Sequence, residues 1–304
     1  MHNLAQILRD EDNSILETTL DSLAPNLENV NTDEAHHRNI NSYYDSHAVQ
    51  FFEELTGQQI HLGYWDQRYP FISLAQAADR LTTVILNQLD LNPMSHLLDI
   101  GCGSGIPAIK IMQQKGCRVD GITINHQQQQ KAYMSARQAK LCDKSHFILG
   151  DATHLPYPND YFDCTLLLES IHHIGHEQAI REASRVLKPG GAILIADAVV
   201  TKESAKEHNK QWLAETFIAK SQLTRQSIME TLILSGFCKL EAIDISQSIQ
   251  PTWTKLTVAT RENKAMICQN HGSEMYQQML EFWDKIDAIW SSTAEYVIFK
   301  AYKL

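Results

Sequence analysis

Two adjacent histidines and a later aspartate are the side chains of this sequence best suited to moving a proton. Residues 168–174 read LESIHHI, so His172 and His173 follow an apolar run directly, and Asp197 ends a later apolar run. An imidazole has a pKa near 6.5, which lets a neutral histidine accept a proton from a hydroxyl at neutral pH. We predict that His173 is the leading general base, His172 the second candidate and Asp197 an orienting or auxiliary acid. The alternative is that the two histidines only hydrogen-bond their loop.

A glycine-rich segment is the strongest single motif. Residues 97–105 read LLDIGCGSG, which places Asp99 before three alternating glycines and ahead of a helical pattern. Glycine adopts positive φ and lets a ligand approach the backbone, and the N–H groups of a helix N-terminus face such a ligand. Dinucleotide sites instead use G-x-G-x-x-G and an acid after the second strand, where this chain has Thr123 and Asn125. The motif therefore predicts a nucleoside-binding loop and disfavours a nicotinamide-dependent oxidoreductase.

The elements that position these residues follow from the hydrophobic pattern. Short apolar runs at 96–100, 118–122, 146–149, 164–168 and 192–196 alternate with helical patterns at 106–115, 127–140 and 177–186. Such an alternation indicates βαβ units and a parallel sheet. Ligands of open parallel sheets bind at the carboxyl ends of the strands, so we expect the glycine loop and both histidines to face one site. The sequence KPGG at 188–191 predicts a sharp turn before the fifth strand.

The two ends of the chain carry further helical patterns. Residues 1–75 are polar with apolar positions at helical spacing, which predicts short helices. After residue 200, strand-like runs at 237–245 and 296–302 enclose two long helical patterns, at about 254–269 and 274–291. Those helices stand where many sheet proteins have a short hairpin, so we interpret them as an inserted cap.

The composition narrows the class of protein and its partners. Acidic residues outnumber basic ones 36 to 26, a formal charge of -10 that disfavours nucleic acid and anionic membranes as partners. The sequence shows no secretory leader and no apolar stretch of the roughly 18 residues that a membrane span needs. Its six cysteines are scattered without zinc spacing, so we expect a cytoplasmic protein without a bound metal. Residues 33–37 read DEAHH, which we interpret as a solvated helix face and not a metal cluster.

Taken in this order, the motifs resemble those of the class I S-adenosylmethionine-dependent methyltransferases, over about residues 40–245. GITINHQQ at 121–128, GDA at 150–152 and LKPGG at 187–191 are similar to segments that follow the glycine loop in this family. The resemblance implies that the glycine loop holds the methionine end of the cofactor, the 121–128 segment the ribose, and the GDA turn the adenine. The implied cofactor-binding residues are Asp99, Gly101, Cys102, Gly103, Gly105, Thr123, Ile124, Gln128, Asp151, Ala152, Glu169, Tyr44 and Trp65.

Aromatic residues near the N-terminus narrow the resemblance to small-molecule methyltransferases. YYD at 43–45 and IHLGYWD at 60–66 are similar to the lid of the sarcosine, tocopherol and natural-product sugar methyltransferases. Aromatic faces attract a sulfonium by ~0.5–2 kcal/mol and exclude water from it, so we expect Tyr44 and Trp65 to contact the cofactor. The alternative is an aromatic cluster that only packs helices together.

The resemblance also implies the fold and its division. We expect an α/β protein with a Rossmann-like, seven-stranded, mostly parallel sheet whose last strand is antiparallel. A helical lid at 1–75 would precede a methyltransferase domain at 76–304, and the cap insertion at about 247–294 would roof the acceptor pocket.

The implied activity is transfer of a methyl group from S-adenosylmethionine to a hydroxyl of a small or medium-sized metabolite, such as a natural product or a glycoside. The reaction would be an SN2 displacement with a histidine base. C-methylation of an isoprenoid or sterol-like substrate and N-methylation of an amine remain alternatives, because one fold serves several acceptors. A module that binds the cofactor without catalysis is the alternative from another class. The predicted partner is the small-molecule acceptor, and the sequence is compatible with a homo-oligomer.

Overall fold

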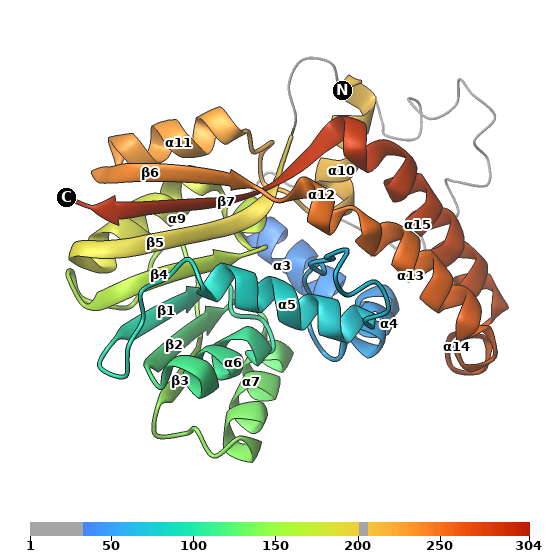
Figure 1. Ribbon diagram of the computed structural model, residues 1–304, viewed down its shortest axis with the longest axis horizontal. Helices are drawn as coiled ribbons and strands as arrows, with labels where there is room; N and C mark the ends of the chain where they lie inside the picture. Colours follow the sequence, from blue (N-terminus) through green and yellow to red (C-terminus); the bar gives the residue numbers. More distant parts are fainter. Residues whose placement is uncertain (1–32, 201–205) are drawn as a thin grey trace.

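A seven-stranded sheet lies at the centre of the computed structural model, which describes residues 33–200 and 206–304 (Figure 1). The strands are β1 (His96–Ile100), β2 (Arg118–Thr123), β3 (Ser145–Leu149), β4 (Phe162–Leu168), β5 (Leu187–Val200), β6 (Phe237–Asp244) and β7 (Ala294–Lys303). Their order is β3-β2-β1-β4-β5-β7-β6, and β7 runs antiparallel to both of its neighbours. The predicted fold class is confirmed. The helical pattern expected before residue 33 lies outside the described residues.

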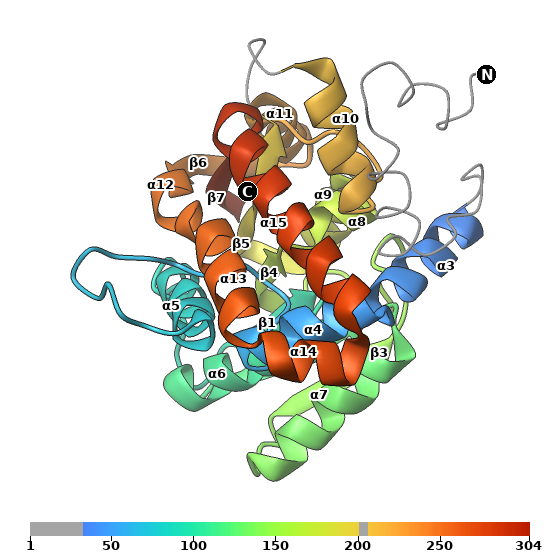
Figure 2. The same ribbon diagram turned by 90° about the vertical axis from the view of Figure 1, so that its right-hand side faces the viewer.

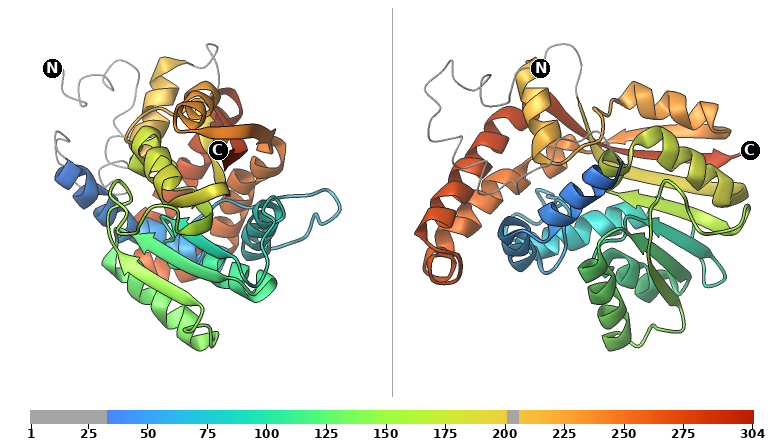
Figure 3. Two further views of the ribbon diagram at one scale, coloured as in Figure 1. Left: turned by 90° about the vertical axis from the view of Figure 1, so that its left-hand side faces the viewer. Right: turned by 180° about the vertical axis from the view of Figure 1, so that it is seen from behind.

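Helices cover both faces of the sheet because successive strand residues point to opposite sides. Leu97 packs in the cluster that includes side chains of α5 (Leu74–Leu86), α6 (Ile106–Lys115) and α7 (His126–Gln138). Leu98 packs in the cluster that includes side chains of α9 (His176–Val186) and α11 (Arg225–Leu234), on the other face (Figure 3). All five residues of β1 are buried, as expected for a parallel strand covered on both faces.

The remaining helices gather at one end of the sheet. These helices are α3 (Asp33–Tyr44), α4 (His47–Thr56), α8 (Ile171–Ile174), α10 (Glu207–Thr216), α12 (Ser246–Ile249), α13 (Pro251–Glu262), α14 (Lys264–His271) and α15 (Ser273–Thr293). Figure 2 shows α3 and α4 beside α13–α15 at this end. The helices α12–α15 stand between β6 and β7, which confirms the predicted insertion. The division of the chain at residue 75 stays a prediction.

The expected sharp turn at 188–191 is wrong. These residues belong to β5, which begins at Leu187. Leu187 pairs with Phe162 and Ala192 with Cys164, so five steps along β5 match two steps along β4. The extra residues form an irregularity of the strand, with Gly190 at φ 78°, instead of a turn that precedes it.

Candidate active site

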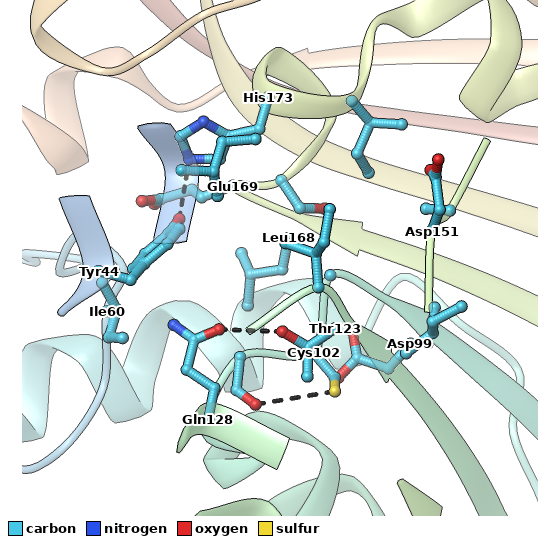
Figure 4. Close-up of a pocket in the computed structure, with 18 of the residues that line it drawn as sticks. Tyr44, Ile60, Asp99, Cys102, Thr123, Gln128, Asp151, Leu168, Glu169 and His173 are labelled. Carbon is cyan, nitrogen blue, oxygen red and sulfur yellow. Dashed lines mark hydrogen bonds between the residues drawn. The ribbon is translucent and has the colours of Figure 1, made fainter. Parts of the chain in front are cut away.

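A cavity of about 960 Å³ opens at the carboxyl ends of the central strands (Figure 4). Asp99 of β1, Thr123 of β2 and Leu168 of β4 line it, together with Asp151 from the loop after β3. The strand order reverses between β1 and β4, and an open α/β sheet binds its ligands at this place. The fold therefore brings the predicted glycine loop and the segments after β2, β3 and β4 to one cavity.

The glycine loop is fixed by β2 and by the loop after β4. The backbone N–H groups of Gly101 and Cys102 both donate to Ile122 O, at 2.9 and 3.0 Å. Gly101 has φ 80°, and a Cβ built there would lie 2.4 Å from the Cβ of Ser170. Ser170 Oγ in turn donates to Ile100 O at 2.6 Å. Position 101 requires glycine because of both its conformation and the close approach of Ser170.

This double requirement predicts that Gly101→Ala destabilises the fold by about 2–5 kcal/mol. The positive φ costs about 1–2 kcal/mol and the forced contact with Ser170 about 1–3 kcal/mol. Urea unfolding of the two proteins measures the difference in the free energy of unfolding. The matched control is Gly236→Ala, because Gly236 has φ 84° and no atom within 4 Å of an added Cβ. Equal losses in the two variants would contradict the steric argument.

Helix α3 presents one face to the cavity. His36, Ile40 and Tyr44 stand four residues apart and all line it. His36 is buried and its Nε2 donates to the backbone carbonyl of His173 at 2.7 Å. The neighbouring His37 also lines the cavity, and its Nε2 lies 3.7 Å from Asp151 Oδ2. The interpretation of this segment as a solvated face is therefore wrong for His36, although the spacing from His36 to Tyr44 could have revealed the buried stripe.

His173 makes hydrogen bonds through both ring nitrogens. Its Nδ1 lies 3.2 Å from Ile218 O, and a carbonyl only accepts, so Nδ1 carries the proton. Its Nε2 then accepts from the hydroxyl of Tyr44 at 2.8 Å (Figure 4). Burial, with the neighbouring His172, lowers the pKa of His173 well below 6.5. His173 is thus a neutral imidazole, and its Nε2 lone pair already accepts a hydrogen bond from Tyr44.

His172 has the opposite arrangement. Its Nδ1 lies 3.0 and 2.9 Å from the two carboxylate oxygens of Asp197, which hold the proton on Nδ1. The lone pair of Nε2 has no hydrogen-bond partner within residues 33–200 and 206–304. Burial opposes protonation, but the charge and hydrogen bond of Asp197, with the charge of Glu169, raise the net pKa of His172 above 6.5. Of the two histidines, His172 is therefore the one with a free lone pair, whereas the order predicted from the sequence places His173 first.

Two of the predicted cofactor-binding residues do not line the cavity. Gly105 is the N-cap of α6 with φ 75°, and a Cβ there would lie 2.7 Å from Ala132 Cβ, so it serves the packing of α6 against α7. Trp65 is buried, and its Nε1 donates to Thr252 Oγ1 of α13 at 2.9 Å. The structure gives Trp65 the packing role that was the alternative. The predicted residues that do line the cavity are Tyr44, Asp99, Gly101, Cys102, Gly103, Thr123, Ile124, Gln128, Asp151, Ala152 and Glu169.

Other lining residues were not predicted from the sequence. They are His36, His37, Ile40, Ile60, His61, Ser104, Pro107, Ser170, Ile174 and Lys220, among others. Lys220 ties α3 to this wall, because its Nζ lies 2.8 Å from Asp33 Oδ1 and its backbone N–H donates to His172 O at 2.8 Å. No local motif in the sequence marks Lys220. It lines the cavity because of the path that the chain takes after α10.

Comparisons with known proteins decide the family. Residues 98–195 match the family model described as a methyltransferase domain. The chain is 36% identical over 217 residues to the 27-O-demethylrifamycin SV methyltransferase of Amycolatopsis mediterranei. The aligned residues cover 70% of this chain and 78% of that protein. The chain belongs to the class I S-adenosylmethionine-dependent methyltransferases.

Further relatives of this methyltransferase act on different atoms. The (+)-O-methylkolavelool synthase of Herpetosiphon aurantiacus is 28% identical over 87% of this chain and 93% of that protein. The sterol 24-C-methyltransferase erg6 of Schizosaccharomyces pombe is 29% identical over 70% of this chain and 57% of that protein. The solved structure of the [4+2]-cyclase SpnF has a TM-score of 0.75 and 26% identity, and covers 88% of this chain and 96% of that one.

The cavity suits the cofactor of this family. Asp99 is buried, and its Oδ2 has no hydrogen-bond partner in the described parts of the chain. Burial raises the pKa of Asp99 to about 7, so a cationic group beside it would be strongly favoured. S-adenosylmethionine carries such groups, an ammonium and a sulfonium. Thr123 Oγ1 donates to Gln128 Oε1 at 3.0 Å, which places both side chains together on the wall expected to hold the ribose (Figure 4).

Glu169 lines the cofactor cavity and two neighbouring cavities. Its Oε1 accepts from Leu62 N at 3.0 Å and from the Tyr296 hydroxyl at 2.8 Å. Burial first, and then the charge of Asp197, raise the pKa of Glu169 to about 8. Its φ of 47° is unusual for a residue with a side chain.

Among the described residues, no group of three or more His, Cys, Asp or Glu side chains is arranged to hold a metal ion. In the same part of the chain, no helix is both long and apolar enough to span a bilayer.

Proposed function

We propose that this methyltransferase methylates a hydroxyl group of a small or medium-sized metabolite, such as a natural product or a glycoside. The observation that carries the proposal is the His172–Asp197 pair, which leaves a histidine lone pair free. An alcohol must lose its proton when it is methylated, and a positioned histidine is the side chain that most often takes it. The names of two relatives, which denote O-methylation, support the same acceptor atom.

The chain's own residues would divide the work as follows. S-adenosylmethionine supplies an electrophilic methyl group on a sulfonium. His172 Nε2 accepts the hydroxyl proton, and the Asp197 carboxylate stabilises the resulting imidazolium through Nδ1. The Tyr44 hydroxyl donates to His173 and holds its ring in place, while burial keeps that ring neutral, so that His173 forms a wall of the site. Apolar residues that line the cavities next to His172 exclude water from the reacting atoms. The same walls would position the acceptor for in-line attack on the methyl group.

The test is to identify the methylated atom. The purified protein is incubated with isotope-labelled S-adenosylmethionine and fractionated extract of its source cells, and labelled products are sought by high-resolution mass spectrometry. A labelled ether supports the proposal. A label on carbon or nitrogen contradicts it.

C-methylation of an isoprenoid or sterol-like substrate is the second candidate. The aromatic side chains of Tyr43, Phe52, Phe282 and Trp283 line the cavity next to His172, and such faces stabilise a cationic carbon. The sterol methyltransferase among the relatives supports it as well. N-methylation of an amine has no such support from the described residues, and the same labelling experiment separates the three.

The Asp197 charge predicts the pH dependence of the reaction. His172 accepts a proton only when it is neutral, so kcat/KM should rise with pH through its pKa, which lies above 6.5. Asp197→Asn removes the charge that stabilises protonated His172, so the acidic limb should move to lower pH while the plateau falls. Initial rates between pH 5 and 9 measure both, with the exposed Glu215→Gln as the control. An acidic limb that keeps its midpoint in Asp197→Asn would contradict the pair.

A further inference from the structure

Two more cavities share lining residues with the cofactor cavity. The first, of about 950 Å³, is here called the aromatic lobe and is lined by Tyr43, Phe52, Met279, Phe282 and Trp283 among others. The second, of about 680 Å³, is called the aliphatic lobe and is lined by Val199, Val200, Leu213, Ala214, Leu223 and Trp290 among others. The aromatic lobe lies among α3, α4 and α15. The aliphatic lobe lies among β5, α10 and α15, so α15 borders both lobes.

His172, the proposed base, lines both lobes. The residues that line both lobes are Leu62, Glu169, His172, Phe217 and Trp253. Glu169 also lines the cofactor cavity, and is the described residue common to all three spaces. The proposed base is therefore at the border that the two lobes share, here called the junction, and Glu169 is at the border of all three cavities.

The walls of both lobes are mainly apolar, with the uncharged polar residues Ser221 and Gln222 in the aliphatic lobe and Tyr43, Tyr44 and Thr216 in the aromatic lobe. Lys210 is the described charged side chain that lines the aliphatic lobe apart from Glu169, His172 and Asp197. Its Nζ lies 3.4 Å from Glu207 Oε2, so its charge is paired. Pockets with mainly apolar walls bind ligands chiefly through buried apolar area. A highly charged acceptor would leave most of its groups without partners on such walls.

We propose that the acceptor is an apolar alcohol whose hydroxyl lies in the interior of its carbon skeleton, so that one side of the skeleton fills the aromatic lobe and the other the aliphatic lobe. The inference rests on the proposed O-methylation and names its substrate class. A terminal alcohol that brings its hydroxyl to His172 fills one lobe and leaves the other without contacts. An interior hydroxyl at the same place fills both and gains the apolar contacts of each.

The experiment blocks one lobe at a time with the same substitution. Ala48 of α4 lines the aromatic lobe and Ala214 of α10 lines the aliphatic lobe, and both are partly buried. The variants Ala48→Phe and Ala214→Phe are compared with the original protein for binding of 1-dodecanol and 6-dodecanol, by calorimetry in the presence of S-adenosylhomocysteine. Overpacking of a filled lobe should weaken binding by about tenfold or more. We expect both variants to weaken 6-dodecanol and one of them to weaken 1-dodecanol.

Controls separate this inference from misfolding. Neither alanine lines the cofactor cavity, so both variants should keep the affinity for S-adenosylhomocysteine and the unfolding temperature of the original protein. Ala48→Leu and Ala214→Leu replace any variant that fails this check. The two-lobe site is overturned if 6-dodecanol binding responds to one variant only or to neither. The interior position of the hydroxyl is overturned if both variants weaken 1-dodecanol as well.

The same samples keep the inference distinct from the proposed function. Ether formation from labelled S-adenosylmethionine is measured by mass spectrometry for both alcohols. Binding of 6-dodecanol across both lobes without an ether product counts against O-methylation and leaves the two-lobe site in place. An ether product whose formation depends on one lobe alone overturns the two-lobe site and supports O-methylation.

Discussion

Replacing His172 by alanine should lower kcat by about 10²–10⁴-fold, the contribution that a positioned general base makes. The imidazole of His172 is held by Asp197 through Nδ1 and keeps its Nε2 lone pair free. His37 also lines the site beside a carboxylate, but its Nε2 lies 3.7 Å from Asp151 Oδ2, beyond hydrogen-bond distance. Rates with saturating S-adenosylmethionine, and the dissociation constant of S-adenosylhomocysteine, are the quantities to measure. The dissociation constant should stay unchanged, because His172 does not line the cofactor cavity.

The neighbouring histidine supplies the matched comparison. His173→Asn keeps a side-chain N–H donor for Ile218 O but removes the imidazole that accepts from Tyr44. Because His173 lines the cofactor cavity, this variant should weaken cofactor binding more than His172→Ala does, and lower kcat less. The reverse pattern, with the larger loss of kcat in His173→Asn, would restore His173 as the base.

Replacing Asp99 by asparagine should weaken S-adenosylhomocysteine binding by about 10–150-fold. The buried Oδ2 of Asp99 has no partner among the residues that the structure describes, so a bound ammonium would be its main compensation. A hydrogen bond to a charged group contributes about 1.5–3 kcal/mol, which corresponds to this range of affinity. Calorimetric titration measures it. An exposed carboxylate, Asp90, provides the control variant Asp90→Asn.

The same substitution should stabilise the ligand-free protein. The pKa of Asp99 is about 7 in the folded chain, above the value of about 3.9 in an unfolded one, so its charge opposes folding. That cost is absent below pH 4, grows as the pH rises and is fully present above pH 7. Asp99→Asn should therefore raise the free energy of unfolding by on the order of 1–3 kcal/mol at pH 8 and by less at pH 5. A loss of stability at pH 8 would show that the carboxylate is paired without ligand.

The sequence by itself determined the fold and the floor of the cofactor site. The strand at His96–Ile100 and the helix at Ile106–Lys115 begin and end where the hydrophobic pattern predicts. These elements can be predicted because hydrophobic periodicity is a property of the local sequence. The glycine loop can be predicted because glycine is the residue that adopts positive φ most readily. Because β1, β2 and β4 run parallel, their carboxyl ends lie at the same end of the sheet. Most of the predicted cofactor-binding residues line the cavity for this reason.

Only the tertiary structure decided what each aromatic or imidazole side chain does. Whether His172 or His173 is free to accept a proton depends on Asp197, Tyr44 and Ile218, which lie between 25 and 129 residues away along the chain. Trp65 stands in an aromatic segment of the expected kind, yet Thr252 of α13, which is 187 residues away, binds its indole away from the cofactor cavity. Sequence patterns report the residue type and the face of an element on which it stands. The partner of a ring nitrogen or an indole is set by long-range packing, so the choice of His172 as the proposed base depends on how the helices pack on the sheet.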